Sequence, residues 1–97
     1  MNNHDAEYRN FRLWGDDLNF DIDCLRSFVV VAESMSVSRA ADTVGRSQST
    51  VSQQIAKLET QVGKGLLVRR KGLVIELTSE GAKLLQIAYI LVYLLMA

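Results

Sequence analysis

The feature that most constrains the fold is a pair of helical patterns separated by one tight turn. Residues 38–45 contain good helix formers and end in Gly45, which suits a left-handed exit, and Ser38 is the expected N-cap. Residues 48–62 repeat apolar side chains at three- and four-residue spacing, and Ser47 is placed to cap them. Such a short connection between two helices predicts a helix-turn-helix.

The segments on either side extend this motif. Residues 21–34 (DIDCLRSFVVVAES) have an apolar face at helical spacing, although the β-branched run 29–31 also permits a strand. The segment LLVRRKGLVIELT predicts a β-hairpin with a basic tip, and Thr78 is placed to cap a last, largely apolar helix. We therefore predict a mainly α fold, a winged helix-turn-helix with a small β-hairpin wing and a C-terminal helix.

The same order of elements divides the chain. We expect residues 1–20 to form a flexible extension, residues 21–78 to form the winged helix-turn-helix domain, and residues 79–97 to form a truncated linker helix for dimerisation. The sequence shows no repeats, low-complexity tracts or Pro-rich linkers.

Charge is distributed unevenly although the formal net charge is zero. Residues 37–83 hold eight bases and four acids, a net of +4, whereas residues 1–36 hold three bases and seven acids, a net of −4. The basic part coincides with the predicted helix-turn-helix and hairpin, which favours a nucleic-acid partner.

Other classes of function find no support in the residue pattern. A nucleophile–base pair, metal-ligand spacing and a phosphate-binding glycine loop are all missing from the sequence, so we expect no enzyme, no cofactor and no metal. Cys24 is the only cysteine and is expected to be buried, and the acidic N-terminus does not resemble a secretory signal. These features predict a cytoplasmic protein.

The stretch GRSQSTVSQQ at residues 45–54 carries the candidate chemistry. Short hydroxyl and amide side chains at the start of a helix let its backbone approach DNA closely, and glutamine can pair bidentately with adenine in the major groove. Basic side chains at a hairpin tip can reach the sugar-phosphate backbone or a narrow minor groove. The same residues also serve as ordinary helix caps and solvated turns, so the residues alone leave both interpretations open.

From residue 25 to about residue 85, the sequence resembles the N-terminal domain of LysR-type transcriptional regulators. The segments RSQSTVSQQ and VGKGL are most similar to the HexA-type branch of that family. The motifs that carry the resemblance are F-x-x-V-A-E at 28–33, S-x-x-x-A-A at 36–41, S-Q-x-x-[VL]-S at 47–52, I-x-x-L-E at 55–59, G-x-x-L-[F]-x-R at 63–69 and L-T-x-x-G at 77–81.

The resemblance implies sequence-specific binding of double-stranded DNA by a bacterial, nucleoid-associated homodimer. Its recognition helix would face the major groove, its wing would contact the backbone, and its last helix would pair with its own copy. The candidate recognition-helix residues are Ser47, Gln48, Ser49, Thr50, Ser52 and Gln53. The candidate wing and backbone residues are Arg46, Arg69, Arg70 and Lys71. The candidate dimerisation residues are Leu84, Leu85, Ala88, Leu91 and Val92.

The sequence departs from the family pattern in three places. Ser49 stands where proline is common, and Leu67 stands where phenylalanine is usual, which is expected to loosen the wing. The sequence ends at residue 97, so we expect the effector-binding domain to be absent and no small-molecule effector to bind.

The tail and the function leave alternatives. Residues 84–97 carry no charge, which suits a dimerising helix better than a membrane anchor because spanning hydrocarbon needs about 20 residues. A frame-shifted end of a truncated gene would also explain the tail. An interaction protein that forms mixed dimers with full-length relatives, or a non-functional remnant, are the alternatives to an autonomous DNA-binding regulator.

Overall fold

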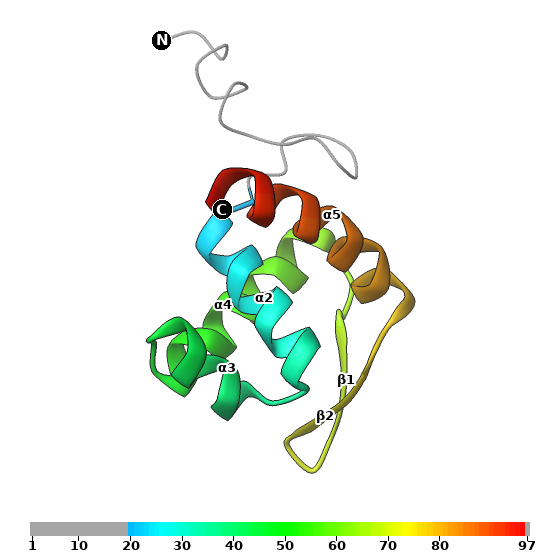
Figure 1. Ribbon diagram of the computed structural model, residues 1–97. Helices are drawn as coiled ribbons and strands as arrows, with labels where there is room; N and C mark the ends of the chain where they lie inside the picture. Colours follow the sequence, from blue (N-terminus) through cyan, green and yellow to red (C-terminus); the bar gives the residue numbers. More distant parts are fainter. Residues whose placement is uncertain (1–19, 97) are drawn as a thin grey trace, which may run out of the picture.

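The structure, a computed structural model, describes residues 20–96 and consists of helices with one small hairpin (Figure 1). The elements in chain order are α2 (Ile22–Ser34), α3 (Val37–Val44), α4 (Gln48–Val62), β1 (Leu67–Arg70), β2 (Leu73–Leu77) and α5 (Ser79–Met96). This order confirms the predicted mainly α winged helix-turn-helix.

Helix α2 is the centre of the domain and packs against α3, α4 and α5. Its side chains Leu25, Phe28 and Val31 are fully or almost fully buried among these helices. Val29 is buried as well, so the β-branched run forms a helix whose several faces are covered. Tertiary burial thus outweighs the modest helix propensity of valine.

Side-chain oxygens fix where the helices begin. Helix α3 begins two residues earlier than expected, because Ser36 Oγ accepts a hydrogen bond from the Arg39 N–H at 3.1 Å. The prediction of Ser38 as the N-cap was therefore wrong, and Ser38 lies exposed in the first turn. The predicted caps Ser47 and Thr78 are confirmed: their hydroxyls accept from the N–H groups three residues on, at 3.1 and 3.0 Å.

Strands β1 and β2 form an antiparallel hairpin that projects from the helices as the wing (Figure 1). The turn residues Lys71 and Gly72 have φ values of 53° and 79°, the positive angles that a type I′ hairpin turn requires. Val74 and Leu67 are both buried and join the wing to the core.

Helix α5 starts where the hairpin returns to the body of the domain. The Thr78 N–H donates to the Leu66 carbonyl at 3.0 Å, and the Thr78 hydroxyl donates to the Gly65 carbonyl at 2.6 Å. Gly81 packs so closely on the segment before β1 that an added Cβ would collide with the Leu66 carbonyl oxygen. The L-T-x-x-G motif therefore joins α5 to the base of the wing.

The beginning of the folded domain lies slightly earlier than expected. Phe20, which the sequence assigned to the extension, is buried in the core, and residues 1–19 lie outside the described part. Cys24 is buried as predicted, and burial raises the pKa of its thiol.

Candidate nucleic-acid interface

Helix α4 presents one apolar and one polar face. Val51, Ile55 and Leu58 are fully buried and seat the helix on the core. Gln48, Ser49 and Gln53 are exposed, and Ser52 and Thr50 are half-buried beside them. The period of the helix thus turns most of the predicted recognition residues to one accessible surface.

The hydroxyl of Ser47 is occupied within the first turn of α4. It accepts from the Thr50 N–H and donates to Thr50 Oγ1 at 2.9 Å, and Ser49 Oγ lies 3.2 Å away. A serine hydroxyl has one proton, so Ser47 uses its donor on its own helix. Ser47 therefore sets the start of α4, and Gln48 and Gln53 offer the longer free groups.

Gln54 has a different role from its neighbour Gln53. Its side-chain oxygen accepts a hydrogen bond from the hydroxyl of Ser27, which is only 2% exposed in the middle of α2. This bond fixes α4 to α2. Sequence reasoning missed this contact. The sequence indicated it only through Ser27, a serine inside an apolar run.

Arg46, in the turn before α4, is partly neutralised. Its guanidinium lies 3.5 Å from a carboxylate oxygen of Asp23, and both side chains are about half exposed. Exposed pairs of this kind are weak, typically about 0–1 kcal/mol. A phosphate can therefore compete with Asp23 for Arg46.

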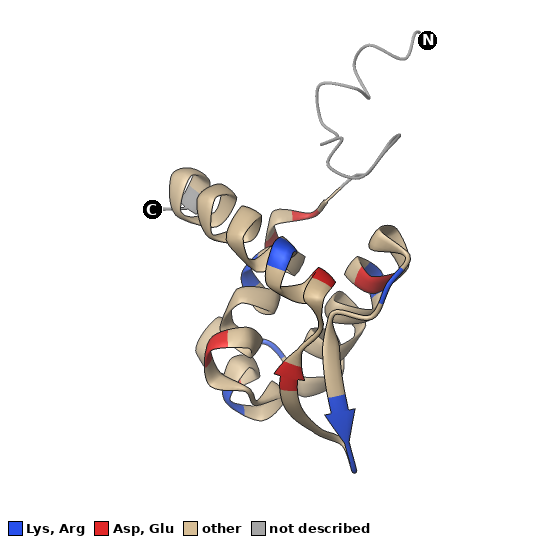
Figure 2. Cartoon of the chain, turned by 90° about the vertical axis from the view of Figure 1, so that its right-hand side faces the viewer, with Lys and Arg blue, Asp and Glu red and all other residues tan. Residues whose placement is uncertain are grey.

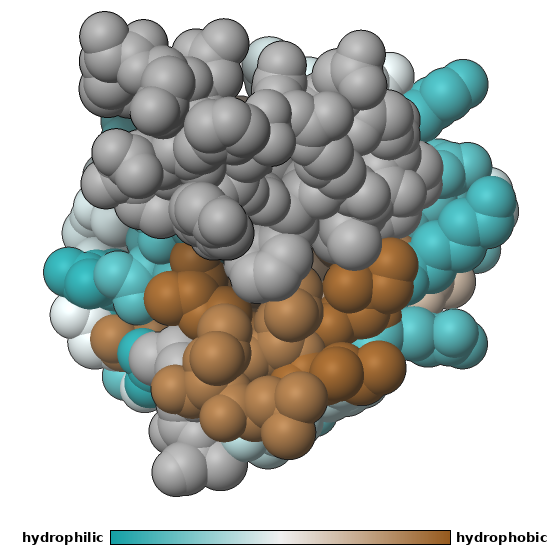
Figure 3. All heavy atoms as spheres, turned by 90° about the horizontal axis from the view of Figure 1, so that it is seen from above, coloured by the Kyte–Doolittle hydropathy of each residue, from teal (hydrophilic) through white to brown (hydrophobic). Residues whose placement is uncertain are grey.

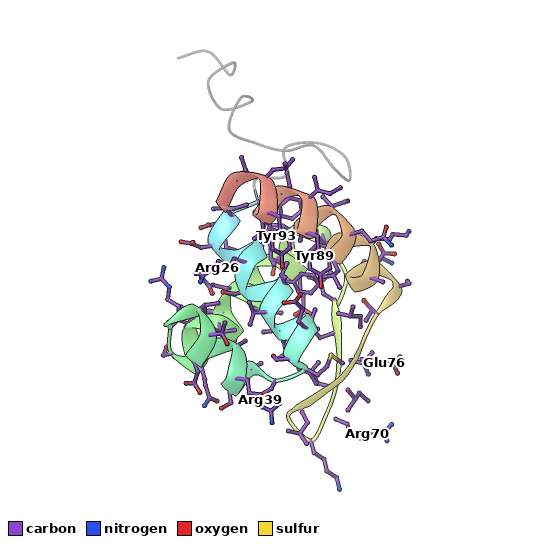
Figure 4. All side chains as sticks on the ribbon, in the orientation of Figure 1. Arg26, Arg39, Arg70, Glu76, Tyr89 and Tyr93 are labelled. Atoms are coloured by element: carbon purple, nitrogen blue, oxygen red, sulfur yellow. The ribbon has the colours of Figure 1, made fainter. Side chains whose placement is uncertain are left out.

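The wing carries exposed cations at its far end. Arg69, Arg70 and Lys71 are all exposed, and Figure 2 shows the basic residues at the tip of the hairpin. Arg39 extends from α3 at the same end of the molecule, away from α5 (Figure 4). Sequence reasoning missed Arg39 as a candidate contact residue. Its position in the first turn of α3, the first helix of the helix-turn-helix, could have indicated it.

The predicted dimerisation residues are distributed differently from the expectation. Leu84, Ala88 and Val92 are buried in the domain's own core, so they are not available to a partner in this arrangement. Leu85 and Leu91 are half-buried against the same core. Because most residues of α5 after Lys83 are apolar, the sequence leaves its inward face undetermined, and the role of these residues in dimerisation stays a prediction.

The outward side of α5 is also apolar, and Figure 3 shows apolar side chains gathered on this side of the molecule. The large exposed apolar residues on it are Ile90, Tyr93, Leu94 and Leu95. No helix within residues 20–96 is long and apolar enough to cross a membrane.

A polar contact holds α5 on α2. The Tyr89 hydroxyl donates to Glu33 Oε2 at 2.9 Å, and the Tyr89 and Tyr93 rings stack with centroids 5.7 Å apart (Figure 4). The hydrogen bond to Glu33 raises the pKa of Tyr89, because losing the proton would lose the bond and place two negative charges together.

Known proteins combine these features in the same order. Residues 22–82 match the family described as bacterial regulatory helix-turn-helix protein, lysR family. The chain is 49% identical over 67 residues to the HTH-type transcriptional regulator DgdR of Burkholderia cepacia; this covers 69% of the chain and 22% of DgdR. The chain thus spans about a fifth of the length of that relative.

Solved structures agree. The fold matches the CbnR_DBD–DNA complex with a TM-score of 0.71 and 31% identity, covering 76% of this chain and 84% of that one. It matches the BenM_DBD/catB site 1 DNA complex with a TM-score of 0.68 and 35% identity, covering 75% and 80%. The chain belongs to the LysR family of bacterial helix-turn-helix regulatory proteins.

Proposed function

We propose that the chain binds double-stranded DNA in a sequence-specific manner, with α4 in the major groove. The observation that carries the proposal is the exposed polar face of α4, with Gln48, Ser49 and Gln53 free of the core that holds the opposite face. Glutamine amides pair bidentately with adenine, and each good base contact contributes about 1–3 kcal/mol of discrimination.

The basic residues supply the affinity. Arg69, Arg70 and Lys71 on the wing and Arg39 on α3 are exposed and would contact phosphates or the adjacent minor groove. Such contacts fix the register of a protein on the duplex while carrying little sequence information. If the chain binds DNA in this way, we infer that it acts at the nucleoid.

We further propose that two copies pair through the outward side of α5. Ile87, Ile90, Leu91 and Leu94 recur at three- and four-residue spacing, and Ile90 and Leu94 are exposed. A second copy would cover this stripe by two-fold symmetry and present two recognition helices to two half-sites.

Selection of bound duplexes from a random DNA pool tests the proposal with the full 97-residue chain. We expect enrichment of an interrupted palindrome. A single enriched half-site would support recognition by α4 and contradict pairing through α5. A folded chain that enriches no sequence would contradict the proposal as a whole.

A further inference from the structure

The tip of the wing carries an apolar side chain that the domain's own core does not use. Leu73 is 69% exposed at the start of β2, whereas its neighbour Val74 fills the core. Leu73 pairs across the hairpin with Arg70, beside Lys71 in the turn. An exposed leucine among cations, at the end of a projecting hairpin, is placed to touch whatever the cations bind.

Leu73 also lines a cleft between the wing and the helix-turn-helix. The cleft has a volume of about 190 Å³. On the helix side it is lined by the polar residues Ser36, Ser38 and Gln48 together with the apolar Met35 and Val37, and on the wing side by Gly72, Leu73 and Val74. The helix wall therefore offers two serine hydroxyls and a glutamine amide beside apolar side chains, and the wing wall is apolar.

This arrangement matches the geometry of a duplex. A major groove and the adjacent minor groove are separated by one sugar-phosphate strand. If α4 occupies the major groove and the wing reaches the minor groove, that strand passes between them, along the cleft. The hydroxyls of Ser36 and Ser38 then face phosphate oxygens, and Leu73 faces the deoxyribose and the edge of the minor groove.

We propose that Leu73 is a specificity-determining residue that contacts the minor groove and favours base pairs lacking the guanine N2 amino group. The inference rests on the proposed DNA binding and adds a second place where sequence is read. The N2 amino group is the feature that distinguishes G·C from A·T in the minor groove. A leucine pressed against it would remove water from a hydrogen-bond donor without replacing the bond.

Inosine makes it possible to measure minor-groove recognition separately from major-groove recognition. An inosine–cytosine pair has the major-groove pattern of G·C but lacks the N2 amino group, so its minor groove resembles that of A·T. The probe is the duplex selected from the random pool, with the pairs flanking each half-site set to A·T, I·C or G·C. We expect the unchanged chain to bind the A·T and I·C duplexes equally and the G·C duplex about tenfold more weakly, as suits one hydrogen-bond donor that loses its water and gains no partner.

Two variants assign this preference to one side chain. Leu73→Ala is expected to bring the ratio of affinities for the I·C and G·C duplexes close to one. Ile75→Ala is the matched control, because Ile75 is an exposed apolar residue of the same strand, at 43%, that does not line the cleft. The control should keep the ratio of the unchanged chain.

Each other outcome overturns the inference. An unchanged ratio in Leu73→Ala, or an I·C duplex that binds as weakly as the G·C duplex, would refute minor-groove contact by Leu73 and leave DNA binding by α4 standing. Loss of the ratio in both variants would refute the assignment to Leu73. If the unchanged chain binds none of the duplexes above background, the proposed function fails and the inference fails with it.

Discussion

Single side chains on the candidate interface differ in how free they are to meet DNA. The Ser47 hydroxyl is committed to the cap of α4, and Gln54 is held by Ser27. Gln48 and Gln53 remain exposed and do not pack into the core. We therefore expect base recognition to depend mainly on these two glutamines, and the small serines to permit the close approach of the helix.

Arg69 on the wing should contribute affinity without sequence choice. Arg69→Ala is expected to weaken binding to specific and random duplexes alike and to reduce the slope of log affinity against log salt by about one. Lys64→Ala removes an exposed cation from the loop between α4 and β1 and serves as the control. Titrations at several salt concentrations check this, and a loss confined to the specific duplex would contradict it.

Asp23 should restrain Arg46. Asp23→Asn removes the charge 3.5 Å from the guanidinium, so Arg46 becomes available to phosphate. Because an exposed pair is worth about 0–1 kcal/mol, the expected gain in DNA affinity is at most about fivefold. Asp42→Asn, which changes an exposed acid on α3, controls for the general loss of negative charge. Equal gains in both variants would show that the ion pair has no specific role.

The sequence alone located the polar face of α4 but could not separate its residues by role. Gln53 and Gln54 are adjacent and chemically identical, and only the fold brings Ser27 to one of them. Arg46 likewise follows from the charge pattern, whereas its partner Asp23 lies in a different helix. Contacts between distant segments depend on packing, which a local pattern does not contain.

Among the elements, the attachment of α5 to the wing depends on Gly81. Gly81→Ala places a Cβ against the Leu66 carbonyl oxygen and is expected to lower the free energy of unfolding by about 1–3 kcal/mol, as overpacking does. Gly65→Ala is the matched control, since its added Cβ would find only Glu59 Oε2, at 3.8 Å. Urea unfolding of both variants measures the difference, and equal stability would contradict the close packing of α5.

The contact between α5 and α2 should weaken at alkaline pH. The pKa of Tyr89 is raised above its ordinary value by its bond to Glu33, so the stabilisation is fully present below that ordinary value, about 10. It is lost as pH rises through the raised pKa of the folded protein, because the ionised tyrosine can no longer donate.

Tyr89→Phe removes the hydroxyl and therefore this alkaline dependence. The variant is expected to lose about 0.5 kcal/mol near neutral pH, because the bond is exposed to solvent. Tyr93→Phe controls for the other tyrosine of the stack. An unchanged pH profile of unfolding in Tyr89→Phe would show that the bond does not hold the helix.

The bounds of elements with a clear apolar period or with terminal glycine residues could be predicted from the sequence. For α5, the existence of the helix could be predicted but its packing could not. Gly45 adopts the left-handed conformation that its position indicated, and the predicted hairpin tip turns at Lys71 and Gly72. The inward face of α5 was not predictable, because apolar residues follow Lys83 on nearly all sides of the helix and Gln86 alone marks a polar position among them. Its packing partner, α2, decides which of them become core.

At the scale of the whole molecule, dimerisation should depend on the outward side of α5. Leu94 is 76% exposed there, so Leu94→Glu leaves the core intact and is expected to convert a dimer into a monomer. The variant should then select single half-sites from a random pool in place of an interrupted palindrome. Gln86→Glu adds the same charge at an exposed position of the same helix and serves as the control.

Sedimentation measures the mass of these variants in solution. A Leu94→Glu chain that remains dimeric would contradict pairing through the exposed residues of α5. An unchanged chain that is monomeric at all concentrations would contradict pairing through α5 altogether.

Recognition of base sequence by the polar face of α4 can be measured in one titration. The double variant Gln48→Ala/Gln53→Ala is compared with the unchanged chain on the selected duplex and on a scrambled duplex. Thr60→Ala, an exposed residue at the far end of the same helix, is the control. We expect the double variant to bind the selected duplex at least about thirtyfold more weakly and the scrambled duplex as before, since two base contacts are lost. Equal affinity of the double variant and the unchanged chain for the selected duplex would contradict recognition through α4.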